Sequence, residues 1–399
     1  MFELDSMQKM VAKAVREFAE REILPQVEAM EAGEAFPYPI MAKMMKEILA
    51  ADWIEERLLA KAARMEKGES KGDGAKDEVG GMDPLLHSLI LKELSRISPG
   101  FCMSWGVSVG LCGQGILNRG TPDQIRRWAA PVMTCKKVGA WALTEAEAGS
   151  DAFGSMKTTA ARNGDGWILN GSKTFITNGP HADVFLLYAR DEGGEVRAFV
   201  LERGMKGLAT GAPFKKMGMK DSPTGEVFLD GVAAGPEHLL GGGETAGGRG
   251  AVRASLGGER SGIVPMCLGI VERCYELSVK YAKKRRQFGR PIAEFQAVQM
   301  KIAEMYILLT NLWNMTVRLA WMQREGKKDM AYACASKVYA ARSAVTASLD
   351  AIQIHGGYGY MAEYHVEKLM RDAKLLEIGA GTTDINLLTA ARLELGLAR

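Results

Sequence analysis

The sequence predicts an α+β protein of several domains: an N-terminal α-helical domain, a middle β-barrel and a C-terminal four-helix bundle. Apolar residues recur at helical spacing toward both ends of the chain, whereas the middle third alternates short β-branched and aromatic segments with Gly, Asn and Asp. The chain has 399 residues, which is long for a single hydrophobic core. We therefore place three domains at residues 1–135, 136–240 and 250–399.

The first domain is predicted to be helical up to residue 60, where the helical pattern stops. Residues 61–82 are charged, rich in Gly and poor in large apolar residues, so we interpret them as a mobile loop or an insertion. Helical patterning resumes at His87–Leu94 and again near Leu111–Leu117.

The middle domain is predicted from strand-like segments, namely GWILNG, KTFITNG, DVFLLYARD, VRAFVLERG and TGEVFLDGV. A Gly-rich run at 241–250 follows, and we interpret it as a linker. Amphipathic stretches then return at 267–281 and 302–320, and an Ala-rich helix is expected at 329–352. Long helices with short links argue for a bundle.

Composition and charge exclude several classes of protein. The 51 basic and 48 acidic residues leave a net charge of +3, which is too balanced for a nucleic-acid-binding protein. No uninterrupted apolar stretch is long enough to span a bilayer, and the N-terminus lacks the features of a signal or transit peptide. We therefore expect a soluble, cytoplasmic protein. The six cysteines form no CxxC pair and the five histidines no HxxxH spacing, so neither a metal site nor a disulfide framework is expected.

Two motifs in the middle domain suggest a ligand site. WALTEAEAGSDAFGSMKTTA begins at Trp141 and indicates a strand that gives way to a Gly/Ser turn, where backbone N–H groups and a hydroxyl can face a polar ring or a phosphate. In GSKTFITNG, residues 171–179, Phe175 offers an aromatic face and Thr177 a hydroxyl on the same side of a strand. A surface turn and a hairpin with a buried Phe are the ordinary alternatives.

Two further motifs lie in the last domain. KKRRQFGRPIAEFQAVQMKIAEM, from Lys283, places basic side chains beside an aromatic ring, which suits a pyrophosphate, although a solvated helix end has the same pattern. The segment Gln353–Leu388 contains two Gly-rich turns. Its second turn, at 379–384, would set backbone amides at a helix N-terminus, which is a natural site for an anion or a carbonyl.

The four motifs, in this order and spacing, resemble those of the acyl-CoA dehydrogenase family. The resemblance runs from the N-terminal helices to the last helix and is strongest over residues 138–392. It implies the three-domain fold, bound FAD, an acyl-CoA substrate, commonly a homotetramer, and an electron-transferring flavoprotein as electron acceptor. The implied reaction is α,β-dehydrogenation of the thioester to the 2-enoyl-CoA.

Family positions carry over to this chain residue by residue. The resemblance implies FAD contacts from Leu143, Thr144, Gly149, Ser150, Phe175, Thr177, Arg285, Gln287, Phe288, Gln296, Gln353, Gly357, Thr382 and Asp384, and substrate contacts from Ser150, Arg260, Gly379 and Gly381. The positions from Arg285 to Gly357 match those that reach FAD across a subunit interface. Phe175 stands where the family usually has Trp, and Asp384 where it usually has Glu.

The catalytic base departs from the common family pattern. Ala380 takes the place of the glutamate in the usual YEGT-type turn and cannot accept a proton. A minority of the family, including isovaleryl-CoA dehydrogenase, has the same GAGT turn and takes its base from a Glu-Arg pair that opens the first bundle helix. Glu259-Arg260 is that pair here, although a solvated ion pair at a helix start is the ordinary alternative. The Ala380 backbone N–H and a flavin hydroxyl would then bind the enolate oxygen.

The same turn bears on the substrate. Gly379 and Ala380 replace a bulky Tyr-Glu pair, which predicts a branched, cyclic or aromatic acyl group, unless Gly379 only satisfies the turn. Two other functions stay open. One is an acyl-CoA oxidase or desulfinase-like flavoprotein on the same scaffold, and the other is a catalytically silent member that acts as an interaction protein.

Overall fold

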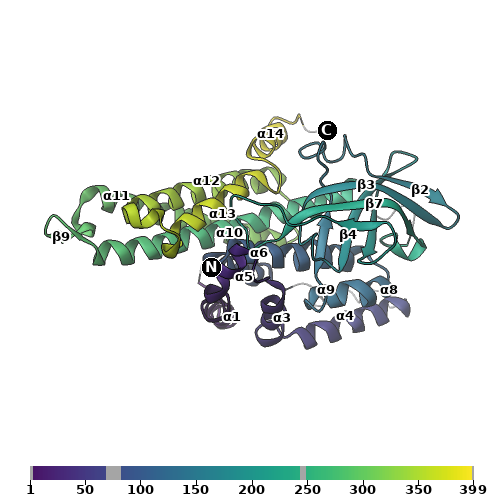
Figure 1. Ribbon diagram of the computed structural model, residues 1–399, viewed down its shortest axis with the longest axis horizontal. Helices are drawn as coiled ribbons and strands as arrows, with labels where there is room; N and C mark the ends of the chain where they lie inside the picture. The colour runs from purple at the N-terminus through teal and green to yellow at the C-terminus, as the bar shows by residue number, and fades with distance from the viewer. Residues whose placement is uncertain (1–2, 69–81, 243–248, 398–399) are drawn as a thin grey trace.

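The computed structural model describes residues 3–68, 82–242 and 249–397, and of residues 249–259 it describes the backbone but not the side chains. Figure 1 shows a long helical bundle, a β-sheet beside one end of it, and N-terminal helices that lie under both. The predicted order of a helical, a β and a helical domain is confirmed.

The N-terminal domain is helical, and its first helix has a capping box. The Asp5 carboxylate accepts a hydrogen bond from the Gln8 N–H, and the Gln8 side chain accepts one from the Asp5 N–H. Short π- and 3₁₀-helical turns join the longer elements. The helices are α1 (Ser6–Phe18), α2 (Val27–Ala32), α3 (Tyr38–Glu47), α4 (Ala51–Glu66), α5 (Pro84–Ile97), α6 (Pro99–Trp105), α7 (Gln114–Arg119), α8 (Pro122–Gln124) and α9 (Ala130–Met133).

The predicted loop at 61–82 is only partly a loop. Helix α4 continues to Glu66, because Leu58 and Ala62 are buried in the core and the residues between are strong helix formers. The prediction is therefore wrong for 61–66, and residues 69–81 lie outside the described part of the chain.

One helical segment of the described residues is long and apolar enough to cross a membrane, which the sequence did not lead us to expect. It runs from Pro99 to Arg119, through α6, α7 and the π-helical turn between them. In this fold 72% of its apolar 18-residue window is buried inside the protein, as is typical of a core helix.

The middle domain is one curved, half-barrel sheet. Its strands are β1 (Gly139–Ala142), β2 (Thr159–Asn163), β3 (Gly166–Thr177), β4 (Val184–Asp191), β5 (Val196–Glu202), β6 (Leu208–Thr210) and β7 (Thr224–Ala234). They pair in the order β1-β4-β2-β3-β7-β6, and β5 pairs with β4. The segment GWILNG and the first part of KTFITNG, which were predicted as separate strands, form the single strand β3.

The C-terminal domain is the predicted bundle. Its elements are α10 (Arg249–Lys284), the short strands β8 (Arg286–Gln287) and β9 (Arg290–Pro291), α11 (Gln296–Arg324), α12 (Met330–His355), α13 (Val366–Ile378) and α14 (Thr383–Glu394). Buried alanines on α12 let α10 and α13 pack closely against it. Helix α10 begins at Arg249, so the end of the predicted linker is helical, and residues 243–248 lie outside the described part.

A buried polar cluster ties the three domains together. Lys368 of α13 lies 3.3 Å from an Asp221 carboxylate oxygen, in the loop before β7, and also pairs with Asp372. Asp221 accepts a hydrogen bond from the Ser98 hydroxyl, which caps α6. Since each domain contributes one or more partners, the cluster fixes how the sheet sits on the helices.

Candidate active site

The first group of predicted site residues lies where β1 ends against β3. Leu143 and Thr144 directly follow β1, and Leu143 is buried whereas Thr144 is half-buried. The Thr144 carbonyl accepts a hydrogen bond of 2.9 Å from the Thr174 N–H. Thr177 ends β3 and is half-buried. The structure therefore brings the first two motifs together.

Phe175 lies at an irregular point of β3. The register of β3 with β7 shifts between Lys173 and Ile176, and Phe175 has a left-handed φ of 56°. The residue is 68% exposed, and its ring centroid lies 5.8 Å from that of Phe214. The alternative of an ordinary hairpin with a buried Phe is therefore wrong, and an aromatic face is accessible to a planar ligand.

Gly149 and Ser150 lie in an exposed loop just beyond the first motif. The loop begins with a narrow turn in which the Ala148 N–H donates to the Glu145 carbonyl at 3.1 Å. A Cβ built on Gly149 would meet no described atom within 4 Å, so the fold itself does not require glycine there. The exposed backbone can approach a ligand closely, as the predicted phosphate contact needs.

The second group of predicted residues lines a hollow of about 540 Å³ at the end of the bundle. Its lining residues are Tyr281, Arg285, Gln287, Ile292, Ile354, His355, Gly356, Gly357, Tyr358 and Met361. The Tyr281 and His355 rings stack with centroids 4.3 Å apart, and burial lowers the pKa of His355. Stacked rings, a guanidinium and open glycine backbone suit an adenine and its pyrophosphate.

Three residues predicted for the same group lie beside this hollow rather than in its lining. Phe288 is 92% exposed, and its ring lies edge-on to Phe295 with centroids 6.0 Å apart. Gln296 and Gln353 are exposed. Side chains with this exposure are accessible to a second molecule.

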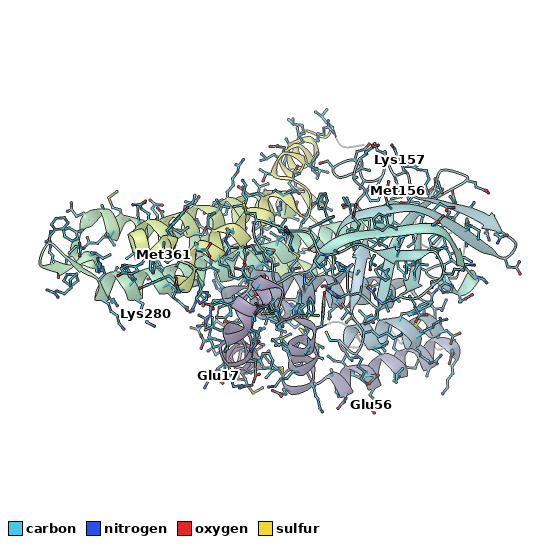
Figure 2. All side chains as sticks on the ribbon, viewed as in Figure 1. Glu17, Glu56, Met156, Lys157, Lys280 and Met361 are labelled. Atoms are coloured by element: carbon cyan, nitrogen blue, oxygen red, sulfur yellow. The ribbon has the colours of Figure 1, made fainter. Side chains whose placement is uncertain are left out.

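The two groups lie far apart within one chain. Figure 1 shows β9, next to the hollow, at the end of the bundle that points away from β3. In Figure 2, Met361, which lines the hollow, lies on the bundle, whereas Lys157 lies across the molecule on the sheet domain. Lys157 marks the first group, because its backbone N–H donates to the carboxylate of Glu145, the residue after Thr144. One chain therefore does not join the two groups into a continuous site.

The third group is the turn 379–382 between α13 and α14. Ala380 has φ 55° and Gly381 has φ 80°, so two successive residues are left-handed. The side-chain amide of Asn386, which is fully buried, donates to the Gly381 carbonyl at 2.7 Å. Lys337 Nζ donates to the same carbonyl at 2.8 Å. These bonds hold a conformation that costs an alanine about 1 kcal/mol.

Thr382 and Asp384 begin α14. The Thr382 hydroxyl accepts a hydrogen bond of 3.3 Å from the Ile385 N–H and caps the helix. Asp384 is exposed in the first turn. Their predicted contacts with FAD stay predictions, since the capping bond alone accounts for a threonine at 382.

Arg260 lies eleven residues after Arg249, the first residue of α10, so the prediction that the Glu-Arg pair opens this helix is wrong. Its side chain nevertheless reaches the turn. A Cβ built on Gly381 would lie 3.6 Å from Arg260 Nη2. Arg260 Nη1 lies 3.1 Å from Met330 Sδ, and Arg260 Nε is buried with no hydrogen-bond partner among the described residues. The structure thus brings Arg260 of the predicted pair and the predicted turn together, with a guanidinium donor left for an anionic or carbonyl group.

Glu259 directly precedes Arg260 in α10, and its side chain lies outside the described part of the structure. Its backbone is therefore one residue from the contact with the turn. Its role as the base stays a prediction.

Two side chains that hold the turn, Lys337 and Asn386, were not predicted from the sequence. Asn386 lies inside the fourth motif, and a polar residue on the buried face of α14 was a usable signal. Lys337 is the fully buried lysine of an Ala-rich helix, but its partner is a backbone carbonyl 44 residues away, which no local pattern reveals.

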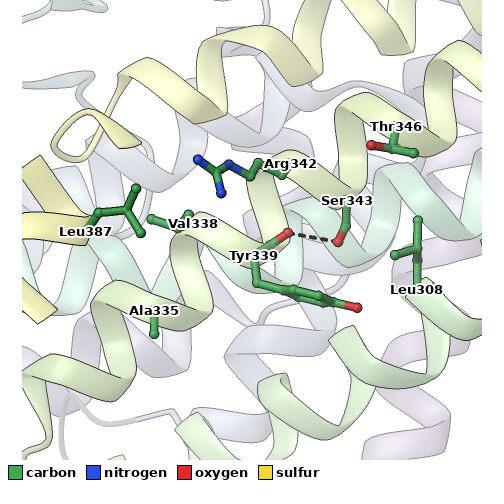
Figure 3. Close-up of a pocket in the computed structure, with 8 residues that line it drawn as sticks. All are labelled: Leu308, Ala335, Val338, Tyr339, Arg342, Ser343, Thr346 and Leu387. Carbon is green, nitrogen blue, oxygen red and sulfur yellow. Dashed lines mark hydrogen bonds between the residues drawn. The ribbon is translucent and has the colours of Figure 1, made fainter. Parts of the chain in front are cut away.

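A second hollow, of about 290 Å³, lies between α11, α12 and α14. Figure 3 shows Tyr339, Arg342 and Leu387 among its lining residues, with the Ser343 hydroxyl donating to the Tyr339 carbonyl. It holds none of the predicted site residues.

Comparison with known proteins decides the family. The family model described as the N-terminal domain of acyl-CoA dehydrogenase matches residues 5–58 and 73–136. The model of the middle domain matches residues 140–232, and the model of the C-terminal domain matches residues 246–395. The chain belongs to the acyl-CoA dehydrogenase family. An acyl-CoA dehydrogenase of Bacillus subtilis (strain 168) is 36% identical to it over 395 residues, which cover 98% of each chain.

Two further members of the family bear on the subgroup. The mitochondrial isovaleryl-CoA dehydrogenase of Oryza sativa subsp. japonica is 32% identical over 395 residues, or 97% of this chain and 91% of the relative. The solved structure of butyryl-CoA dehydrogenase from Megasphaera elsdenii has a TM-score of 0.86 and 32% identity, and covers 99% of this chain and 100% of that chain. Equal identities do not distinguish an isovaleryl-type member from the others.

The predicted fold, enzyme class and cofactor are confirmed: the chain is an FAD-dependent acyl-CoA dehydrogenase. The described residues fit FAD. Phe175 offers an exposed ring for the flavin, and the hollow beside Arg285 offers stacked rings and a cation for the adenine and pyrophosphate.

Proposed function

We propose that this enzyme converts an acyl-CoA with a branched, cyclic or aromatic acyl group to the 2-enoyl-CoA, with Glu259 as the base that removes the α-proton. One contact carries the proposal. Arg260, the next residue in α10, lies against the turn in which Ala380 replaces the usual glutamate. Glu259 therefore adjoins a residue whose guanidinium reaches the turn where the usual carboxylate is missing.

The chemistry requires a carboxylate in a dry site and donors aimed at the enolate oxygen. FAD, when bound, accepts the two electrons and the β-hydrogen. Lys337 and Asn386 hold the turn rigid, so the Ala380 N–H keeps one orientation and can donate to the thioester oxygen as negative charge develops there. Arg260 Nε, which is buried without a described partner, supports a role in binding the substrate.

Space beside the turn supports a bulky acyl group. Gly379 has φ −71°, which any residue can adopt, so the turn does not demand glycine at this position. A Cβ built there would meet only the Leu375 carbonyl oxygen, at 3.6 Å, among the described atoms. The side chain is therefore absent for a reason other than backbone conformation, and room for a substituent on the acyl chain is the reason we favour.

The separation of the first two groups supports a site shared between subunits of a homotetramer. In this proposal Thr144 and Phe175 of one chain bind the flavin, and Arg285 and Gln287 of a second chain bind the adenosine half. Exposed apolar side chains on α11 and α14 supply surface for such contacts; they include Met300, Tyr306, Ile307, Leu387 and Leu388.

Mixed oligomers test the shared site. Phe175→Ala and Arg285→Met chains should each retain FAD poorly, but when refolded together they should regain it in part, because some sites then combine two intact halves. No recovery in a mixture of the expected tetramer mass, measured by light scattering, would count against a site built from two chains.

We propose an electron-transferring flavoprotein as the electron acceptor, while cytoplasmic location stays a prediction from the sequence. The oxidase alternative differs in the reaction with oxygen. Reduced enzyme mixed with aerated buffer should reoxidise slowly, and fast oxygen consumption would favour the oxidase.

Anaerobic bleaching of the bound flavin tests the reaction and the acyl group together. Isovaleryl-, glutaryl-, cyclohexanecarbonyl- and phenylpropionyl-CoA should be compared with butyryl- and octanoyl-CoA. The proposal expects the highest kcat/KM with a branched, cyclic or aromatic chain. Fastest bleaching by a straight chain would contradict the substrate class, and no bleaching by any thioester would favour the catalytically silent alternative.

A further inference from the structure

A buried ion pair lies directly beneath the first group of site residues. Lys173 of β3 has a fully buried side chain, and its Nζ lies 2.8 Å from Glu145 Oε1. The same Nζ donates to the Leu143 carbonyl at 3.1 Å. The Lys173 ammonium therefore bonds to the residue before Thr144 and to the residue after it, just beyond the end of β1.

The Glu145 carboxylate is also bound from a third segment. It accepts hydrogen bonds from the backbone N–H groups of Lys157, at 2.6 Å, and Thr158, at 3.0 Å. Burial alone would raise the pKa of Glu145, but these donors and Lys173 lower it. Burial lowers the pKa of Lys173 to about 8 against the attraction of Glu145, so both groups are charged at neutral pH.

The pair lies where β3 is irregular. The register shift begins at Lys173, and Phe175, two residues on, has a left-handed φ that costs a non-glycine residue about 1 kcal/mol. The Thr174 N–H between them donates to the Thr144 carbonyl. The bulge that exposes the Phe175 ring is thus bonded on one side to the segment 143–145.

Stability alone does not account for such a pair. A buried ion pair contributes little net stability compared with well-packed apolar residues of similar volume, because both charges lose their hydration. What the pair does add is a fixed geometry, since its four polar contacts reach three separate segments.

We propose that Lys173 and Glu145 are positioning residues for the flavin. They set the separation between Thr144 and the Phe175 bulge, so that the ring system fits between the hydroxyl and the aromatic face without rearrangement. The inference rests on the proposed flavin contacts of Thr144, Phe175 and Thr177.

Binding of FAD to the apo-protein tests the inference without any substrate. The variant is the double substitution Glu145→Gln/Lys173→Met, which removes both charges at nearly constant volume and leaves an acceptor for one of the two backbone N–H groups. Its matched control is Glu147→Gln/Lys157→Met, which removes an exposed ion pair of the same loop. We expect the Kd for FAD, from quenching of flavin fluorescence, to rise at least ~30-fold in the first variant and to stay within about twofold in the control.

Visible circular dichroism of the bound flavin gives the second measurement. It should change in the double variant and in Lys173→Arg, which keeps the charge but not the geometry, and it should be unchanged in the surface control. If the double variant does not fold, Lys173→Arg carries the test alone. A folded variant with wild-type Kd and wild-type visible spectrum would overturn the inference.

Two substitutions separate this result from failure of the proposed site. Thr144→Val and Phe175→Ala should each weaken FAD binding. If they do not, the proposed flavin contacts are wrong. If they do and the Glu145/Lys173 double variant binds FAD normally, only the positioning role is wrong.

Discussion

Replacement of Gly381 by Ala should slow the reaction without removing any functional group. Gly381 has φ 80°, where an L side chain costs about 1–2 kcal/mol. The new Cβ would lie 3.1 Å from Asn386 Nδ2 and 3.6 Å from Arg260 Nη2. The first contact is tighter than normal packing, so the amide that holds the turn must shift. We expect the turn to relieve this strain by shifting away from its catalytic geometry, and a loss of about 2 kcal/mol of transition-state stabilisation corresponds to about a 30-fold lower rate of flavin reduction.

Gly396→Ala is the matched control. Gly396 has φ 66° in the described chain after α14, and a Cβ there would meet no described atom within 4 Å. Both variants therefore carry the left-handed penalty, and only Gly381→Ala disturbs Asn386. Anaerobic stopped-flow reduction by the best thioester of the panel should be slow in the first variant and normal in the second. A normal rate in Gly381→Ala, or an equal loss in both, would refute the reasoning.

Three further predictions follow from other parts of the structure. Lys337→Met should lower kcat for flavin reduction about tenfold with little change in KM or FAD content, because a charged hydrogen bond to the Gly381 carbonyl is lost. The control is Lys280→Met, which changes an exposed lysine on the bundle surface (Figure 2) and should have no effect on kcat. Burial raises the pKa of Asp372 to about 6, so stability from this group is complete below pH 3.8 and is lost as pH rises through 6. Relative to wild type, Asp372→Asn should therefore gain unfolding free energy as pH rises from 4 to 7, measured by denaturant titration. A difference between the two proteins that does not vary with pH would contradict this. Gly269→Ala should lower the unfolding free energy by about 1–3 kcal/mol, because its Cβ would overlap the Lys92 carbonyl and the Ser95 hydroxyl of α5. In the control Gly110→Ala the new Cβ meets no described atom within 4 Å, so the unfolding free energy should not fall.

Much of the fold could be predicted from the sequence, because the period of apolar residues differs between helices and strands. The boundaries were less predictable. Residues 61–66 are charged but stay helical, since one buried alanine, Ala62, anchors them to the core. The bulge at Phe175 was also invisible, because alternation predicts a regular strand and the shift depends on the pairing with β7.

The site could be predicted only where a local motif carries it. Arg285, Gln287 and Gly357 were assigned from two separate motifs, and the structure places all three around one hollow. Lys337, Glu145 and Lys173 were missed because their importance comes from partners distant in sequence. A buried lysine bound to a carbonyl or a carboxylate gives no signal until the chain is folded.

The most direct test of the central claim is the rate of anaerobic flavin reduction in Glu259→Gln. The variant should keep FAD and bind acyl-CoA, and its reduction should be at least ~10²-fold slower than that of wild type, because an amide cannot accept the α-proton. Glu304→Gln, an exposed change on α11, should reduce at the wild-type rate. Near-normal reduction in Glu259→Gln would show that the proton goes elsewhere.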